Sequence, residues 1–478
     1  MTLNSKLRQG TIFIVPCLII LFVCEGFCQP DILWTKLIPG RGNHSGMEAV
    51  RTNDGGFAFC SDGWNGDPNH YNPDFWLCKL DSTGEIQWDE YYASTLEGGR
   101  FADAALTLSL FNDGGYFLGG NAGSDGMAVR TNPEGEPTWI KYLIYEEGYE
   151  RVYASAITES GNILISCAER IALLNDTAEG EIIWHENYID GNFTFWNKIV
   201  HCSENEYFLG GSTADTSAGG FDMCAMRINE DGDLLWLDTF GGELSDFCRA
   251  PVPGPSDSWF LVGTHRFDGG ADCTKAMITK IDSEGAEEWQ RIYDQYPNGD
   301  LLLDAVATPD GGVTACGRDG REDYLLMRFN SEGEVVWREV WDIMGVNECH
   351  SILTIEDGGY FLTGAASNDA WLIRTEPDPA NAVWDVDPSF PNGLCLLPAY
   401  PNPFNSSTRV AFELPIQAQV DIAIYDMLGR RITNLVSGEL SAGNHSAIWK
   451  ADNLPSGIYW CRLEAGNNTA TMKLTLLK

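Results

Sequence analysis

The chain has 478 residues and a formal net charge of −39, with 69 acidic against 30 basic side chains. This length is too great for one ordinary hydrophobic core and indicates two or more domains. An acidic surface of this strength repels phosphate backbones and anionic membranes, which argues against nucleic acid as a partner. The 51 glycines, 16 tryptophans and 17 tyrosines favour a β-rich fold with many turns over a helical bundle.

The first 28 residues have the pattern of a secretory signal peptide. Lys6 and Arg8 form a basic start, and an apolar core over residues 11–24 follows that is short for a membrane span. We expect cleavage before Gln29, which leaves an exported chain with no later membrane span. Lipid attachment at Cys24 or Cys28 is the weaker alternative. The residue before the lipid-bearing cysteine should be small, but Val23 and Phe27 occupy these positions.

Of the 14 cysteines, three lie in the signal segment, which leaves 11 spread singly along the chain without a CxxC pair. An odd number excludes a complete disulfide framework, and zinc would need clustered Cys or His ligands. We therefore expect most cysteines to be small core residues. A bridge between Cys60 and Cys78, which fall on successive strands of one unit, is the alternative for that pair. We expect no metal and no cofactor.

Tryptophan recurs along the chain at intervals of 45 to 54 residues. The repeated positions are Trp34, Trp88, Trp139, Trp184, Trp236, Trp289, Trp337 and Trp384. Seven intervals of about 50 residues, each with several strand patterns, predict a seven-bladed β-propeller. Residues 31–37 precede the first unit and read as a fourth strand. We expect this strand to close the ring in the last blade, beside or in place of residues 382–386.

Three further columns repeat once per unit. An Asp-Gly-Gly turn precedes the second strand, and that strand ends in a small residue: Ser61, Gly120, Cys167, Gly211, Gly263, Gly317 and Gly364. We expect small residues where strands crowd towards the axis or where a neighbouring backbone approaches closely. The third strand ends in a basic column: Lys79, Arg130, Arg227, Lys280, Arg328 and Arg374, with Leu173 in the third unit.

The basic column and the tryptophans are expected to have structural roles. Each cation is expected to pair with an acid or carbonyl of the adjacent blade, with an anion-binding ring as the alternative. A tryptophan at the same strand position in every unit is expected to fill the wedge between blades. The units, with their DGG turn, D-φφφφ-K/R strand and N/D-x-x-G-x-x-x-W hairpin, resemble those of bacterial extracellular propeller proteins. That resemblance covers about three quarters of the chain and implies an architecture, not an activity.

Long loops between the second and third strands hold the candidate ligand-binding residues. The loops are expected at residues 62–73, 212–221 and 264–274, on one face of the ring, and binding residues concentrate on such loops. The candidates are Trp64, His70, Tyr71, His265 and Arg266. Exposed polar insertions without a ligand are the alternative.

No catalytic motif occurs in the sequence: there is no HExxH, GxSxG or GxxxxGK segment. We therefore assign no catalytic residue. An enzyme would show inward-facing carboxylates of unlike environment at one end of the propeller channel. A binding protein would instead show an aromatic patch on the long-loop face.

Composition changes after Trp384, where residues 385–397 read as a linker rich in Asp and Pro. Residues 398–478 hold about seven short strand patterns, which predict a small β-sandwich. This segment resembles the type A sorting domains of the type IX secretion system, and also the Ig-like domain of flagellar hook-capping proteins. The resemblance rests on Tyr400, Pro401, Asn402, Pro403, Phe404, Asn405, Gly429, Arg430, Gly457, Tyr459 and Lys478. It implies export with the type IX machinery as partner, followed by secretion or display on the outer face of the cell.

The sequence thus predicts an all-β chain. Residues 1–28 form a signal peptide, 29–384 a seven-bladed β-propeller, 385–397 a linker and 398–478 an Ig-like β-sandwich. The leading functional hypothesis is non-enzymatic binding or adhesion at the cell surface, with a glycan or a protein as the partner. The alternatives are an extracellular propeller enzyme acting on polysaccharide and a structural surface-layer component.

Overall fold

The structure of the chain is a computed structural model. It describes residues 29–39, 47–63, 73–93, 103–123, 125–143, 151–167, 169–177, 179–189, 193–203, 205–215, 220–242, 244–267, 274–296, 299–342, 345–367, 369–379, 395–400, 404–414, 418–426, 430–440, 443–451, 454–465, 468–476 and 478. The predicted signal peptide lies outside them. Within these ranges the chain forms β-sheets and one short 3-10 turn, η1 (Pro255–Asp257).

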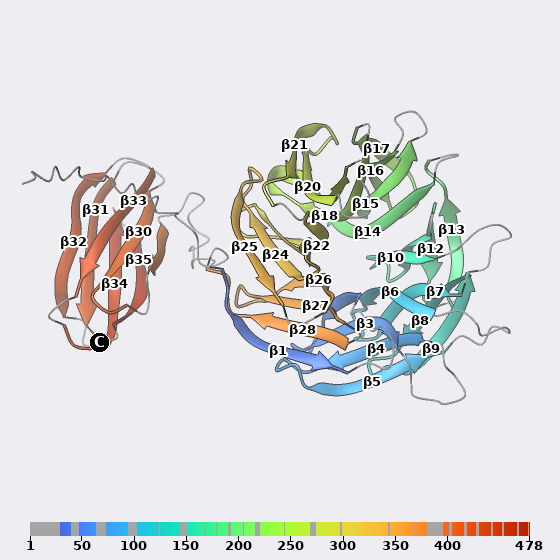
Figure 1. Cartoon of the computed structure of the whole chain (residues 1–478), viewed down its shortest axis with the longest axis horizontal. Coiled ribbons are helices and arrows are strands. Elements are labelled where there is room, and N and C mark those ends of the chain that lie inside the picture. Colours follow the sequence, from blue (N-terminus) through green and yellow to red (C-terminus); the bar gives the residue numbers. More distant parts are fainter. Residues whose placement is uncertain are drawn as a thin grey trace, which may run out of the picture.

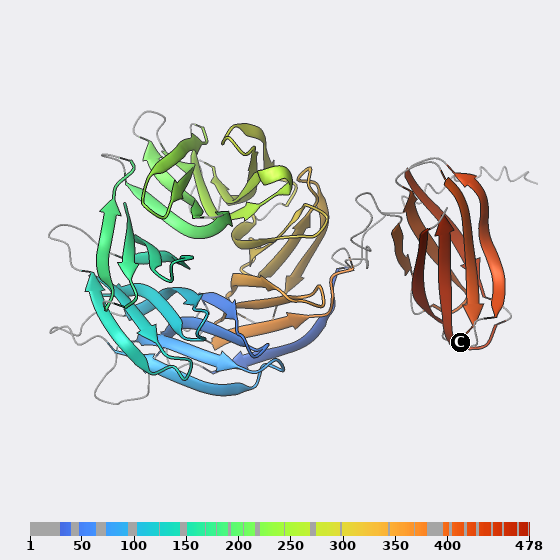
Figure 2. The same cartoon turned by 180° about the vertical axis from the view of Figure 1, so that it is seen from behind.

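Seven four-stranded antiparallel sheets surround a common axis as the blades of a propeller (Figures 1 and 2). The innermost strands are β2 (Glu48–Arg51), β6 (Asp103–Leu110), β10 (Val152–Ile157), β14 (Thr194–Ser203), β18 (Ser245–Pro253), β22 (Leu301–Ala307) and β26 (Asn347–Thr354). The second strands are β3 (Phe57–Gly63), β7 (Tyr116–Ala122), β11 (Ile163–Cys167), β15 (Glu206–Asp215), β19 (Trp259–Arg266), β23 (Val313–Arg318) and β27 (Tyr360–Ala366).

The third strands are β4 (Asp74–Leu80), β8 (Asp125–Thr131), β12 (Arg170–Asn175), β16 (Gly220–Asn229), β20 (Thr274–Ile281), β24 (Tyr324–Phe329) and β28 (Asp369–Thr375). The outermost strands are β5 (Ile86–Tyr92), β9 (Pro137–Leu143), β13 (Glu181–Glu186), β17 (Leu234–Phe240), β21 (Glu287–Tyr293), β25 (Val335–Trp341) and β1 (Ile32–Ile38). The predicted seven-bladed propeller is confirmed.

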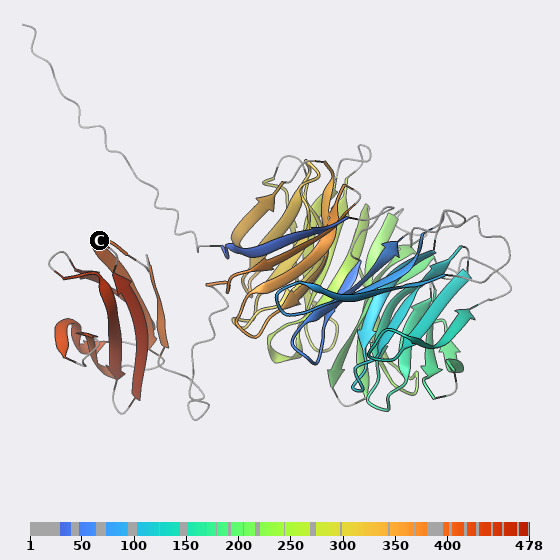
Figure 3. The ribbon, with the colours of Figure 1, turned by 90° about the horizontal axis from the view of Figure 1, so that it is seen from below.

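Strand β1 closes the ring. It is the outermost strand of the seventh sheet and runs antiparallel to β28, although the two are far apart in sequence (Figure 3). Thr35 Oγ1 donates to the carbonyl oxygen of Leu372 at 3.1 Å and accepts from Trp371 Nε1 at 2.6 Å. Residues 382–386, the other predicted closing segment, lie outside the described residues. Closure by pairing joins the first and last blades through backbone hydrogen bonds.

Tryptophans of six outer strands each pack on a turn of the next blade. Trp88 of β5 lies against Gly135, in the turn between β8 and β9, where a Cβ would lie 2.7 Å from the indole ring. Gly135 has a φ of +87°, which favours glycine. Further pairs of this kind are Trp34 with Gly84, Trp139 with Gly180, Trp184 with Gly232, Trp236 with Gly285, and Trp289 with Gly333. The predicted filling of the inter-blade wedge by tryptophan is confirmed.

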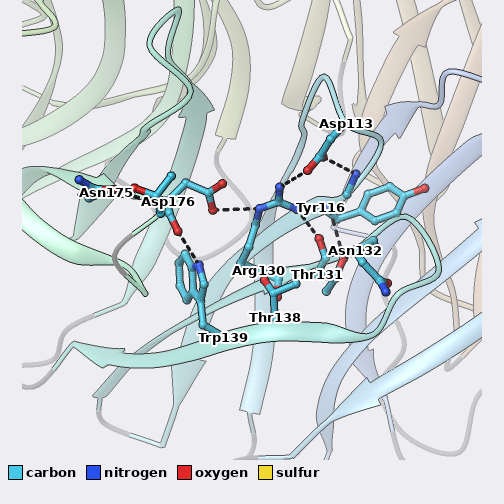
Figure 4. Close-up of polar contacts among 11 residues, drawn as sticks. Asp113, Tyr116, Arg130, Thr131, Asn132, Thr138, Trp139, Asn175 and Asp176 are labelled. Carbon is cyan, nitrogen blue, oxygen red and sulfur yellow. Dashed lines mark hydrogen bonds and ion pairs between the residues drawn. The ribbon is translucent and has the colours of Figure 1, made fainter.

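The basic column forms ion pairs, and several are made inside one blade rather than only across blades. Arg130 of β8 pairs with Asp113 of its own DGG turn at 2.7 Å and with Asp176 of the next blade at 3.0 Å (Figure 4). Lys79 pairs in the same way with Asp54 of its own turn, at 2.8 Å. The expectation of a partner in the adjacent blade was therefore incomplete. Because strand two pairs with strand three, the end of the third strand lies beside the turn that precedes the second.

The third unit shows what happens where the turn lacks its aspartate. Ser160 stands in place of that aspartate, and Leu173 stands in place of the cation. In the fifth unit the turn carries Ser256, and Lys280 pairs instead with Glu288 at 2.8 Å. An unpaired buried charge is costly, so a cation is present only where an acid can reach it. These contacts support a structural role for the column over an anion-binding ring.

Cys60 and Cys78 are both buried and both free. In the β3–β4 pairing Cys60 lies opposite Leu77, and Cys78 lies opposite Phe59. Residues offset by one position point to opposite faces of a sheet, so the two sulfur atoms face different inter-blade cores. The alternative of a disulfide between them is therefore wrong.

Residues 395–476 form a second β-region of two sheets. One sheet contains β29 (Cys395–Tyr400), β30 (Ser407–Leu414) and β33 (Gly443–Lys450). The other contains β32 (Arg431–Leu440), β31 (Ala418–Asp426), β34 (Gly457–Ala465) and β35 (Asn468–Leu476). Trp449 is buried in their core, with ring centres 5.1 Å from Phe404 and 5.2 Å from Tyr459. Strand β29 begins at Cys395, inside the segment that the sequence analysis reads as a linker.

Candidate functional site

A β-bulge in each of six innermost strands turns one side chain towards the central channel. The pairing register shifts by one residue at Leu106, Tyr153, Asn197, Arg249, Leu303 and His350. A bulge leaves one residue out of the ladder and re-aims its side chain. Together with Met47 of the first blade, these residues line a channel cavity of about 160 Å³.

The small-residue column marks these bulges. Gly120 of β7 pairs with Ala105, beside the first bulge, and a Cβ on Gly120 would lie 1.9 Å from the carbonyl oxygen of Ala104. Gly317 has the same relation to the carbonyl oxygen of Leu301, at 1.9 Å. Of the two explanations for the column, the close approach of a neighbouring backbone is correct. Since the bulge brings that carbonyl against the second strand, a larger residue would not fit.

Three charged side chains tie the blades together inside the channel. Lys198 of β14 forms an ion pair with Asp304 of β22, and Asp304 also accepts from the Ile352 amide at 3.1 Å. Glu48 of β2 accepts from the Leu108 amide at 2.9 Å. Burial raises the pKa of the Glu48 carboxyl, while the nearby Lys198 ammonium opposes this shift. Burial lowers the pKa of Lys198, but the attraction of Asp304 and Glu48 outweighs it and leaves that pKa raised.

Replacing Glu48 with glutamine is expected to alter how stability depends on pH. A carboxyl whose pKa is higher in the folded state stabilises the fold below its unfolded pKa, and this contribution is lost as pH rises through the folded pKa. The wild type should therefore lose unfolding free energy relative to Glu48→Gln as pH rises above the ordinary value of 4.5. Urea unfolding of both proteins between about pH 4 and pH 8 measures this difference. A wild type that gains stability relative to the variant over that range would show the opposite sign.

A second charged group lies at one mouth of the channel. Glu348 of β26 lies 3.7 Å from both Arg318 Nε and His350 Nε2. Burial lowers the pKa of His350 although Glu348 opposes the shift, and burial also lowers the pKa of Arg249. Arg249 Nε is buried and lacks a hydrogen-bond partner, and no described carboxylate forms an ion pair with this guanidinium. Arginine remains charged in proteins, so Arg249 is a cation that forms no ion pair within the described part of the chain.

An array of aromatic rings lies beside this mouth. We define the mouth array as Tyr153, Phe193, Phe195, Phe221 and Phe247, from blades 3, 4 and 5. Phe195 lies at its centre, with ring-centre distances of 5.5 Å to Tyr153, 4.8 Å to Phe193 and 6.2 Å to Phe221. Phe221 lies 5.3 Å from Phe247. Phe193 is 55% exposed and the others are half-buried, so the array forms a continuous, partly exposed apolar surface.

The mouth array lies on the long-loop face of the propeller. Phe247 pairs with Thr264 in β19, and Phe221 pairs with Ala214 in β15. The strands also run further into the predicted loops than expected, since β15 ends at Asp215 and β19 at Arg266. The longer strands β15 and β19 satisfy more backbone N–H and C=O groups by pairing, which explains why they extend past the residues with a strand pattern. The aromatic patch expected of a binding protein is therefore present on this face.

Two of the five predicted ligand-binding residues are described. His265 and Arg266 end β19, and His265 is 9% exposed, with Nδ1 2.5 Å from Asp246 Oδ1. Burial raises the pKa of Asp246, and the hydrogen bond from His265 opposes that shift. His265 and Asp246 line a surface cavity of about 490 Å³, separate from the channel mouth. The remaining candidates lie outside the described residues: Trp64, His70 and Tyr71.

Sequence reasoning missed the mouth array and Arg249. The array residues come from innermost and third strands of three blades, with Phe193 just before β14, and no repeated motif distinguishes them. The small-residue column was the one signal in the sequence for the bulges, because its members pair with residues of the innermost strand that lie next to a bulge. In the described part of the chain no group of three or more His, Cys, Asp or Glu side chains is suited to a metal ion.

The sorting-motif residues lie at the ends of strands and in the core of the C-terminal sheets. Phe404 is buried and forms a parallel bridge with Leu476. Tyr459 donates to the carbonyl oxygen of Pro455 at 2.9 Å, and the Lys478 amide donates to Ser456 Oγ at 2.8 Å. Tyr400 ends β29, Asn405 follows the bridge, Arg430 precedes β32 and Gly457 begins β34. The others lie outside the described residues: Pro401, Asn402, Pro403 and Gly429.

The fold and its tail define an extracellular class of protein: a seven-bladed propeller followed by a sorting module. Residues 398–476 match the family of secretion system C-terminal sorting domains, so this part of the chain is a type IX sorting domain. The protein is accordingly secreted or displayed at the cell surface. No helix among the described residues is long and apolar enough to cross a membrane.

Several solved structures are similar to the chain. PorZ of Porphyromonas gingivalis, a surface component of the type IX secretion system, has 13% identity and a TM-score of 0.47, covering 90% of this chain. A PL25 ulvan lyase bound to a GlcA–Rha3S saccharide has 10% identity and a TM-score of 0.50, covering 74% of this chain and 96% of that one. A copper-bound fungal alcohol oxidase has 12% identity and a TM-score of 0.47, covering 94% and 100%.

This chain spans only 59% of the PorZ chain. At 10% identity the likeness to the ulvan lyase shows the fold alone and carries no activity. Curated protein sequences gave no match.

Proposed function

We propose that this protein is a secreted or cell-surface binding protein whose propeller holds a glycan at the channel mouth. The single observation that carries the proposal is the mouth array, a continuous row of rings on the long-loop face. Exposed apolar patches rimmed by polar residues mark interaction sites. The apolar faces of sugar rings pack against aromatic rings, while polar side chains at the rim can hydrogen-bond to the hydroxyl groups.

The environment of the channel carboxylates supports binding over cleavage of a polysaccharide. Asp304 is 4% exposed and holds Lys198 and the Ile352 amide, and Glu48 holds the Leu108 amide. A general acid or base must reach the bond that it acts on, whereas both of these groups are occupied in joining blades. A purely structural surface-layer role would leave the mouth array without a partner.

The full chain is needed to test binding against catalysis. Residues 29–478 would be applied to an array of bacterial, algal and host glycans, and each recognised glycan would then be incubated with the protein. The expected result is retention of a glycan whose chain length stays unchanged. Absence of any retained glycan would contradict the binding proposal, and release of shortened products would favour the enzyme.

We further propose the division of labour along the chain. A signal peptide over residues 1–28 directs the chain to the periplasm, and residues 29–384 form the binding propeller. A linker over residues 385–397 leads to a tail, 398–478, whose motif residues engage the type IX machinery. The sorting-domain match over residues 398–476 supports the role of the tail. His265 and Arg266, with Trp64, His70 and Tyr71, are proposed as secondary contacts on the same face.

Deleting residues 397–478 is expected to abolish surface display, because the deleted segment contains the sorting domain. Display would be measured by accessibility of the propeller to protease added to intact cells, with fractionation to find the retained protein. The full-length Phe247→Ala variant serves as the matched control and should be displayed normally. Unchanged display of the truncated chain would contradict a sorting role for the tail.

A further inference from the structure

Arg249 differs from the cations of the basic column in forming no ion pair with a carboxylate of the described residues. Arg328 pairs with Asp310 at 2.7 Å, and Arg227 pairs through Nε with Glu206 at 2.8 Å and through a terminal amino group with Asp257 at 3.0 Å. For Arg249 no hydrogen bond or ion pair is present among the described residues. The Arg249 side chain is half-buried, and a buried Nε without a hydrogen bond costs stability unless something pairs with it. The position therefore has the character of a binding site more than of a structural contact.

The surroundings of Arg249 place it between an aromatic and a polar surface. Its side chain lines the channel cavity together with His350 and Tyr153. The guanidinium carbon lies 5.8 Å from the ring centre of Phe247, the last member of the mouth array. Glu348 attracts the Arg249 guanidinium, but the Glu348 carboxylate is shared between Arg318 and His350. A ligand that covers the array would therefore meet the Arg249 guanidinium at its end.

We propose that Arg249 forms an anion site at the channel mouth that receives a carboxylate or sulfate group of the bound glycan. This inference rests on the proposed function, and it assigns the class of glycan as acidic. A guanidinium presents a planar fork of donors that matches such groups through paired hydrogen bonds. The net charge of −39 opposes the approach of a densely charged polymer. The site therefore fits a glycan with separated acidic groups in an otherwise neutral chain.

The test compares matched acidic and neutral probes on the full chain, residues 29–478. The probes are oligogalacturonate with its carboxyl-reduced form, and chondroitin sulfate oligosaccharides with their desulfated form. The proteins are the wild type, Arg249→Met, and Arg291→Met, whose arginine is exposed on the outer strand β21. We expect the wild type to bind an acidic probe about tenfold or more tightly than its neutral partner, as loss of a charge-assisted hydrogen bond implies. Arg249→Met should lose this preference and Arg291→Met should keep it.

A second arm needs no glycan. Inorganic sulfate, added at constant ionic strength, should raise the thermal midpoint of the wild type and of Arg291→Met more than that of Arg249→Met, because a ligand of the native state stabilises it. Carboxylate and sulfate recognition are distinguished by which pair of probes shows the preference.

The outcomes separate this inference from the proposed function. Equal affinity of the wild type for both members of each pair would overturn the anion site and leave glycan binding in place. Sulfate stabilisation that depends on Arg249, without binding of any glycan, would retain the anion site and overturn the glycan function. No glycan binding together with an equal sulfate effect in all three proteins would overturn both.

Discussion

Replacing Arg328 with methionine is expected to destabilise the propeller by about 3–5 kcal/mol, the usual cost of removing one partner of a buried ion pair. The Arg328 side chain is fully buried, and its terminal amino groups bond to Asp310 at 2.7 Å and to Tyr360 Oη at 3.3 Å. Asp378, also fully buried, lies 3.8 Å away. The variant would leave this carboxylate in a low-dielectric core without its cation. Urea unfolding of the propeller transition measures the loss.

Two further variants make the Arg328 result interpretable. Arg51→Met removes the exposed pair with Glu356 and should cost no more than about 1 kcal/mol, as surface pairs do. Arg328→Leu combined with Asp310→Ser copies the natural pair of the third unit, Leu173 with Ser160. This double variant should lose less stability than the sum of its single changes. If the stability losses of the two single variants simply add in the double variant, a buried electrostatic role of Arg328 is contradicted. A loss for Arg328→Met as small as that for Arg51→Met would contradict it as well.

Replacing Gly135 with alanine is expected to destabilise the propeller by about 2–5 kcal/mol, which combines left-handed backbone strain with overpacking. Gly135 has a φ of +87°, and a Cβ there would lie 2.7 Å from the Trp88 ring of the preceding blade. The indole is fixed between two blades and cannot move aside without opening the wedge. Thermal and urea unfolding would report the change.

Gly55 provides the matched control for Gly135. It has a similar φ of +82°, but nothing lies within 4 Å of the position that its Cβ would take. Gly55→Ala should therefore show the backbone strain alone, about 1–2 kcal/mol. Equal destabilisation by the two alanines would mean that the contact between Trp88 and Gly135 contributes nothing to blade packing.

The fold could be predicted because its packing rule repeats. Six outer-strand tryptophans pack on a glycine in a turn of the neighbouring blade, so both residues recur with the spacing of the blades. The closing strand was predictable for the same reason, since Trp34 carries the outer-strand pattern ahead of the first full unit. The partner of the basic column was only partly predicted. It depends on which acid the strand register brings within reach, as Lys280 with Glu288 illustrates.

The candidate site could not be predicted, because its residues follow no repeat. Phe195 and Phe247 belong to innermost strands, whereas Phe221 belongs to a third strand, and only the assembled ring brings them together. Arg249 points to the channel because of a bulge, and a bulge is a property of pairing between two strands rather than of local sequence. The small-residue column indicates where the bulges lie, but it does not show which side chains the bulges direct into the channel.

The most direct test of glycan binding at the mouth array compares two proteins, the wild type and the double variant Phe221→Ala/Phe247→Ala. The quantity measured is their affinity for a glycan that the wild type retains in the glycan screen. The control is Ile183→Ala, which removes an exposed apolar side chain from outer strand β13. The double variant should bind at least about tenfold more weakly, because truncating aromatic residues that anchor a ligand costs about 2 kcal/mol or more. The control should bind as the wild type does. Unchanged affinity in the double variant would show that the mouth array is not the binding surface.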